Sequence, residues 1–309
     1  MKMHNLTYSA PLGNTQTDVF VSVCENYFQR LDSLSLVQQL IQIFKAVQRH
    51  RGMSMGTLGG TSVFQKEIQQ QQSQIGRHFQ MLEVFSHRSG KLISTLQQEN
   101  LLSAWLTISE DWQEDSVILN YELHCHLVEQ LLTMISGLGK QLETPLYTPK
   151  DDITLPSQRF NYLEMLHFST RLMPEVSEQI GRIRALATYV SASHICDQDF
   201  RTKLSYLIQC TRVNNEKLRH HIKRVENKPD TELALLSQLK SYEVKLAFLL
   251  SMVENDILGD HIQADSRRIF DLATDIIDLY LKAVIEGTQV LQKWLETDIQ
   301  LLTQANWNN

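Results

Sequence analysis

The sequence is poor in the residues that interrupt regular structure. Its 309 residues include only 12 glycines and 6 prolines, and these gather at a few places. The long stretches between them have the composition of long helices and not of a sheet with many turns. No useful length of chain alternates apolar and polar residues, so we predict essentially no strand.

Other scarcities exclude whole classes of protein. The four cysteines are scattered with no Cys-x-x-Cys pair, which favours free thiols over a zinc site or a disulfide framework. No run approaches the roughly 18 apolar residues of a transmembrane helix, and the first residues lack the apolar core of a signal peptide. The net charge of -6 argues against a nucleic-acid-binding face. We therefore expect a cytoplasmic protein that binds neither membranes nor nucleic acid directly.

Helical periodicity divides the chain into eight segments, with three prolines between 143 and 156 at the crossover. Helices in sets of four pack as bundles around a shared core. We predict an all-α fold of two antiparallel four-helix bundles, at 16–142 and 157–306, after a flexible arm at 1–15. The expected helices cover 17–58, 62–87, 91–109, 112–138, 157–194, 197–226, 230–257 and 265–306.

Two local signals refine these limits. Ser62 and Gln65 have the spacing of a capping box, which predicts that a helix begins at about residue 62. Pro174 lies inside an otherwise helical pattern, and we expect it to kink or restart that helix because proline has no backbone N–H to donate.

The first long helix carries a cation on its apolar face. The stripe passes through Val47 and Met55, and the position between them that would continue it is Arg51. Burying an unpaired charge costs on the order of several kcal/mol, so Arg51 requires an anionic partner or water.

The helix after the crossover repeats this arrangement. Arg184 follows Ile180 by four residues on an apolar stripe, among small residues that would let a ligand or another helix approach. Arg182, four residues after Glu178, is interpreted as half of a routine surface pair. The segments RGMSMGTLGG from Arg51 and RALATYVSAS from Arg184 align as a possible internal duplication.

Two interpretations of these arginines stay open. In the first, Arg51 and Arg184 find no counter-charge within the chain and together bind a small anion, since a guanidinium offers a planar fork of donors. In the second, each pairs with a core carboxylate or extends to solvent. His124 also lies on an apolar stripe, either as a satisfied core histidine or as a neutral donor to the anion. Arg267 and Arg268 could approach the same place, although exposure is the simpler expectation for them.

Four segments in order resemble the bacterial nitrate- and nitrite-sensing domain family. QRHRGMSMGTL at 48–58 resembles the family's first arginine signature, and MPEVSEQIGRIRALATYV at 173–190 its second. YELHCHLVEQLL at 121–132 is similar to its histidine-bearing helix, and RRIFDLATDIIDLY at 267–280 to its late aromatic segment. The resemblance implies two four-helix bundles that bind nitrate or nitrite, without catalysis or cofactor, in signalling linked to transcription regulation.

Carried over by position, the resemblance implies that Arg51 and Arg184 bind the ligand, with His124 as a weaker candidate. The chain departs from the family at His50, where the family has Glu, and at Ala185, where it has Gly. Few residues follow the last matching segment, so we expect a stand-alone sensor that signals to an unidentified output protein, with a homodimer as the expected assembly. The alternative is a ligand-free interaction scaffold or a degenerate sensor.

Enzymatic and metal-binding functions have little support in the sequence. No nucleophile–base arrangement or phosphate-binding loop is evident, so we expect no catalytic residue and no enzyme. A di-iron bundle needs two Glu-x-x-His pairs, and the chain offers only Glu164 with His167. A phosphotransfer bundle would place Lys and Gly soon after its histidine, a pattern that no histidine here shows.

Overall fold

The fold is all-α, as predicted from the scarcity of Gly and Pro. The computed structural model describes residues 13–89, 92–144, 146, 156–226 and 236–307, and it contains no strand within those ranges. The elements are α1 (Gly13–Leu58), α2 (Gln65–Arg88), α3 (Thr95–Ser109), a 3-10 turn η1 (Trp112–Glu114), α4 (Val117–Gln141), α5 (Pro156–His167), a π-helical turn η2 (Phe168–Leu172), α6 (Met173–Ser193), α7 (Gln198–Glu226), α8 (Leu236–Asp256) and α9 (Ser266–Trp307).

The limits of some helices differ from the prediction. Residues 1–12 of the predicted arm lie outside the described residues, and residues 13–15 belong to α1. The capping box expected at Ser62 is wrong, because Phe64 is the N-cap and makes no side-chain cap. A capping box is present instead at Ser94 and Gln97, where it begins α3.

Pro174 restarts a helix, as expected. It stands in the first turn of α6, directly after the π-helical turn η2. Because proline cannot donate to the carbonyl of the preceding turn, the backbone widens there and keeps the chain helical from α5 into α6. Small side chains of this turn meet glycines of two other helices: a Cβ at Gly139 of α4 would clash with Thr170, and one at Gly287 of α9 would clash with Ser169.

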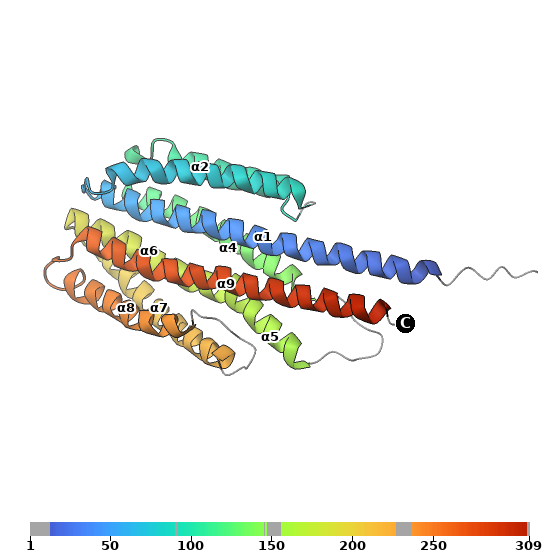
Figure 1. The fold of residues 1–309 in the computed structure, drawn as a ribbon. Helices are drawn as coiled ribbons and strands as arrows, with labels where there is room; N and C mark the ends of the chain where they lie inside the picture. The colour runs from blue at the N-terminus through green and yellow to red at the C-terminus, as the bar shows by residue number, and fades with distance from the viewer. Residues whose placement is uncertain (1–12, 90–91, 145, 147–155, 227–235, 308–309) are drawn as a thin grey trace, which may run out of the picture.

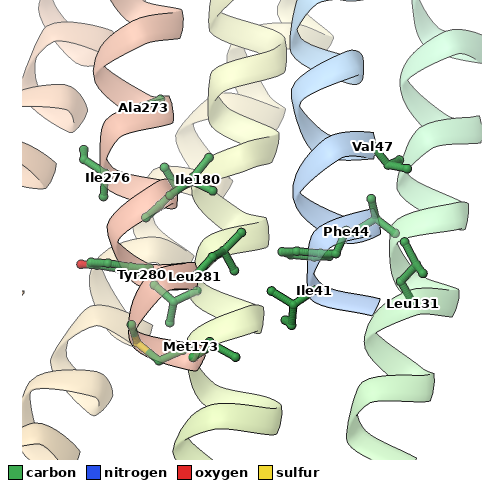
Figure 2. Close-up of a cluster of buried hydrophobic side chains, with 14 of the residues drawn as sticks. Ile41, Phe44, Val47, Leu131, Met173, Ile180, Ala273, Ile276, Tyr280 and Leu281 are labelled. Carbon is green, nitrogen blue, oxygen red and sulfur yellow. The ribbon is translucent and has the colours of Figure 1, made fainter. Parts of the chain in front are cut away.

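Four long helices form the centre of the molecule in the order α9, α6, α1, α4 (Figure 2). α2 packs on α1, whereas α7 packs on α6 and α8 on α9 (Figure 1). α3 packs on α4. Most buried apolar side chains, from both halves of the chain, form one large core, in which Phe44 of α1 and Ile180 of α6 are fully buried. A smaller cluster contains Met53, Phe64, Ile68, Trp112 and Phe270. The two halves of the chain therefore meet along α1 and α6.

α1 and α6 run parallel and approach closely. A Cβ at Gly52 would lie 3.2 Å from Arg184 Nε, and one at Gly56 would lie 2.9 Å from Thr188 Cγ2. Further along, a Cβ at Gly59 would lie 2.8 Å from the Ala192 Cβ. The absent side chains let the two backbones come together, and this seam holds both arginines singled out by the sequence. None of the described helices contains an apolar stretch of the length that a membrane span requires.

Candidate anion site

Arg51 is fully buried and paired with a carboxylate from the other half of the chain. Its Nη1 donates to Glu178 Oε1 at 2.8 Å and its Nη2 to Glu178 Oε2 at 2.9 Å, a bidentate ion pair between α1 and α6. Nη1 also lies 3.2 Å from Cys125 Sγ, and the guanidinium lies 5.8 Å from the centre of the Tyr121 ring. The expectation that Arg51 lacks an internal counter-charge is therefore wrong.

Glu178 is the centre of a buried polar network. It is 4% exposed, and its carboxylate accepts from Gln48 Nε2 at 2.5 Å and from Arg182 Nε at 2.7 Å in addition to Arg51. Burial alone would raise the pKa of Glu178, but the two guanidiniums hold that pKa below its ordinary value. The pairing of Glu178 with Arg182 was predicted, but Glu178 faces the core and not the surface.

Gly181 makes this network possible. A Cβ at that position would lie 2.7 Å from Gln48 Nε2 and 3.0 Å from Arg51 Nη2. The small residue therefore leaves room on α6 for two side chains of α1.

Arg184 is buried without any such partner. It is 1% exposed, and within the described ranges its one hydrogen bond runs from Nη1 to Thr274 Oγ1 of α9 at 2.8 Å. No carboxylate of the described residues forms an ion pair with it, and its Nε and Nη2 have no acceptor there. The guanidinium lies 5.0 Å from the centre of the Phe270 ring, which offers only weak compensation.

The pKa of Arg184 is lowered because the guanidinium is buried without a paired carboxylate among the described residues. Burial, and next the nearby charge of Arg51, lower the pKa of Arg184 to about 9. Burial also disfavours the charged form of Arg51, but the Glu178 carboxylate reverses the effect and raises the pKa of Arg51. Among these three buried groups, Glu178 neutralises one cation, and the charge of Arg184 remains.

Further hydrogen-bonding groups without partners lie on the same face of α6. The hydroxyls of Thr188 and Ser191, one and two turns after Arg184, are buried and have no hydrogen-bond partner in the described part of the chain. Thr188 is one of the residues that face α1 at the glycine seam. This stretch of α6 therefore combines an uncompensated cation with two buried hydroxyl groups.

His124 is fully buried on α4, and both of its ring nitrogens are engaged. Nδ1 lies 2.7 Å from the backbone oxygen of Asn120 and must donate to it, so Nε2 accepts from His50 Nδ1 at 2.8 Å. Burial lowers the pKa of His124 to about 3, so the ring is neutral near pH 7. The pattern is that of a satisfied core histidine and leaves no N–H for an anion.

His50 completes this pair. Its Nδ1 donates to His124, so its Nε2 carries a lone pair, which has no partner among the described residues. The ring lies edge-on to Trp105 and Trp112. His50 therefore offers an acceptor, which an anion does not need, and the structure gives no reason to add it to the site.

The remaining basic candidates lie outside the seam. Arg267 pairs with Glu67 at 2.6 Å and Asp271 at 2.8 Å, and Arg268 is exposed. Of the sequence-predicted site residues, the structure brings Arg51 and Arg184 to one seam, and His124 packs beside it. Sequence reasoning missed Glu178 as the partner of Arg51, and it missed the environment that Thr274 and Phe270 provide for Arg184.

Comparison of the chain with protein-family models, with curated proteins and with solved structures gives no match.

Proposed function

We propose that this protein is a cytoplasmic sensor that binds one small oxyanion, nitrate or nitrite, at Arg184 between α6, α9 and α1. The observation that carries the proposal is the fully buried guanidinium of Arg184, which has two nitrogens without acceptors and no paired carboxylate in the described chain. An uncompensated buried charge costs on the order of several kcal/mol, and a bound monoanion would remove that cost.

The charge balance favours a monoanion. Arg51 and Glu178 neutralise each other, so Arg184 leaves a single positive charge in the seam. The resemblance of 48–58 and 173–190 to nitrate- and nitrite-sensing domains supports the same ligand class. We expect no catalytic step, because the buried residues here bind and orient without offering an activated nucleophile.

The signal would be a change in helix packing. Arg184 projects from α6 toward α1 and α9, so an anion held there contacts the junction of the two halves. An anion that binds one spacing of these helices more tightly than another shifts the protein toward that spacing. We propose that an output protein or a second copy of this chain reads the change.

The size of the ligand bounds the affinity. An anion of four heavy atoms at a ceiling of about -1.5 kcal/mol per atom gives about -6 kcal/mol, or a Kd of roughly tens of micromolar. A concentration of about 100 times Kd would then stabilise the protein by about 2.7 kcal/mol. For a chain of this length that corresponds to a rise in Tm of about 5 °C.

The test is thermal unfolding and calorimetry with sodium nitrate, nitrite and chloride at constant ionic strength. Nitrate or nitrite should raise the Tm of the wild type and of Arg30→Met, but not that of Arg184→Met. Arg30 is the matched control, because it is also buried but donates from all three nitrogens to neutral oxygens of the protein, those of Asn26, Leu142 and Thr144.

Without anion, Arg184→Met should unfold at a higher temperature than the wild type, because the substitution removes a buried charge that has no partner. Folded wild-type protein that shows no heat and no change in Tm with millimolar nitrate or nitrite would refute the proposal.

A further inference from the structure

The two buried arginines have matching surroundings on the next helix. Each guanidinium lies over an aromatic ring, and each donates from Nη1 to a side chain four residues after that ring. These contacts join Arg51 to Tyr121 and Cys125 of α4, and Arg184 to Phe270 and Thr274 of α9.

The sequences around these contacts match as well. YELHCHLVE at 121–129 and FDLATDIID at 270–278 share an aromatic, an acidic residue, a leucine, two aliphatics and a final acidic residue in the same order. On the partner helices, Arg49 and Arg51 correspond to Arg182 and Arg184 at one constant offset. The centre is therefore two copies of one half-site, defined as Arg51 with its α4 neighbours and Arg184 with its α9 neighbours.

The copies differ in one charge. Arg51 receives its carboxylate from Glu178 of α6, six residues before Arg184. The corresponding position of α1, six residues before Arg51, is Lys45. Lys45 pairs with Asp278 at 3.0 Å and offers Arg184 no carboxylate. Among the described residues Arg184 has no paired carboxylate, and the position of α1 that corresponds to Glu178 holds a cation.

The free atoms of Arg184 indicate the shape of its ligand. Arg51 uses Nη1 and Nη2 for the carboxylate of Glu178. Arg184 donates from Nη1 to Thr274, and its Nε and Nη2 have no acceptor among the described residues. Nε and Nη2 together form one edge of the planar guanidinium. Two parallel N–H donors on one edge match two oxygens of a planar oxyanion, and a spherical ion can satisfy them less well.

We propose that the Glu178 carboxylate is a built-in substitute for the ligand. It fills the half-site of Arg51, so the chain takes one external planar monoanion of the nitrate, nitrite or formate type, at the half-site of Arg184. The inference rests on the proposed function and adds to it a stoichiometry of one, a preference for planar oxyanions over chloride, and a specificity-determining position, Lys45.

The test is Lys45→Glu, with Lys45→Gln as the matched control. Lys45 has a side chain that is 36% exposed, so both variants should fold, and Arg49 stands four residues later to support a carboxylate as Arg182 supports Glu178. Calorimetry with sodium nitrate, formate and chloride should show one planar anion bound per wild-type or Lys45→Gln chain. Lys45→Glu should bind each at least about tenfold more weakly, because its own carboxylate competes.

A second readout needs no anion. With Asp278→Asn in both, which removes the repulsion between Asp278 and a new carboxylate at position 45, Lys45→Glu should melt a few degrees above Lys45→Gln. This difference should vanish when Arg184→Met is also present in both. Nitrate binding by Lys45→Glu at wild-type affinity, or a difference in Tm that persists without Arg184, would overturn the inference. If the wild type binds no anion but the difference in Tm depends on Arg184, the proposed function fails while the half-site equivalence stands. Wild-type binding of chloride as tight as that of nitrate overturns the preference for planar ligands.

Discussion

Replacing Glu178 with Gln would test the buried network most directly. The wild-type carboxylate accepts two hydrogen bonds from Arg51 and one each from Arg182 and Gln48. The amide keeps one acceptor oxygen but loses the charge, so Arg51 becomes a second buried guanidinium without a counter-charge. Removing one partner of a buried ion pair costs about 3–5 kcal/mol.

The loss should be visible in unfolding by urea or heat. We expect the free energy of unfolding to fall by about 3 kcal/mol, the lower end of the range, because one acceptor remains. The corresponding decrease in Tm is about 6 °C. Glu254→Gln is the control, because Glu254 makes a similar two-bond pair with Arg212 at 2.8 and 2.6 Å, but on the surface. Exposed pairs of this kind contribute about 1 kcal/mol or less.

Nitrate should recover part of the loss in Glu178→Gln, since the substitution leaves Arg51 without an anionic partner. Equal losses in Glu178→Gln and Glu254→Gln would refute the reasoning, because the buried carboxylate would then matter no more than the surface one. A loss that nitrate does not reduce would leave the stability argument intact but would count against Glu178 as a substitute for the ligand.

Three further predictions concern pH and packing. The pKa of Glu178 is lowered in the folded protein, so the carboxylate stabilises the fold above pH 4.5, its ordinary pKa, and this stabilisation is lost as the pH falls through the folded pKa. Acid titration followed by circular dichroism should therefore show a steeper loss of helix below about pH 4.5 for the wild type than for Glu178→Gln. Parallel titration curves would contradict this. Because the pKa of Arg184 is lowered to about 9, the affinity for nitrate should be constant from about pH 6 to 8 and should fall above about pH 9. Calorimetry measures this affinity, and a constant value up to about pH 10.5 would disprove the prediction. Gly139→Ala should lower the free energy of unfolding by about 1–3 kcal/mol, because the new Cβ would lie 2.8 Å from Thr170 Cβ. Gly137→Ala on the same helix meets nothing within 4 Å and should raise it by about 0.5–1 kcal/mol. Equal changes in Tm for the two variants would contradict this packing.

Much of the fold could be predicted from the sequence, because helix periodicity and the positions of Gly and Pro are local signals. The burial of Arg51 and Arg184 was also predictable, since each interrupts an apolar stripe. The partner of Arg51 was not predictable. Glu178 stands four residues before Arg182, and this spacing already assigns the Glu178 carboxylate a partner on the same helix. Only the contact between α1 and α6 shows that the same carboxylate also serves another helix.

The duplication was only partly visible before the structure. The correspondence of Arg51 with Arg184 could be aligned, but the match between 121–129 and 270–278 follows a different offset. The two matches become one pattern when α4 is seen to serve Arg51 as α9 serves Arg184. Likewise, Ser62 and Gln65 have the spacing of a capping box, but α2 begins after Phe64, whose side chain is fully buried.

The depth of Arg184 also bears on timing. Its side chain is 1% exposed and lies where the glycines of α1 allow α1 and α6 to pack closely together. Under the proposed function, nitrate could reach Arg184 only while those helices are briefly apart, and the frequency of such openings would set both the arrival and the escape of the ion. We therefore expect stopped-flow association rates that level off as nitrate concentration increases. A receptor with this kinetic behaviour averages over rapid fluctuations in supply and responds to sustained levels.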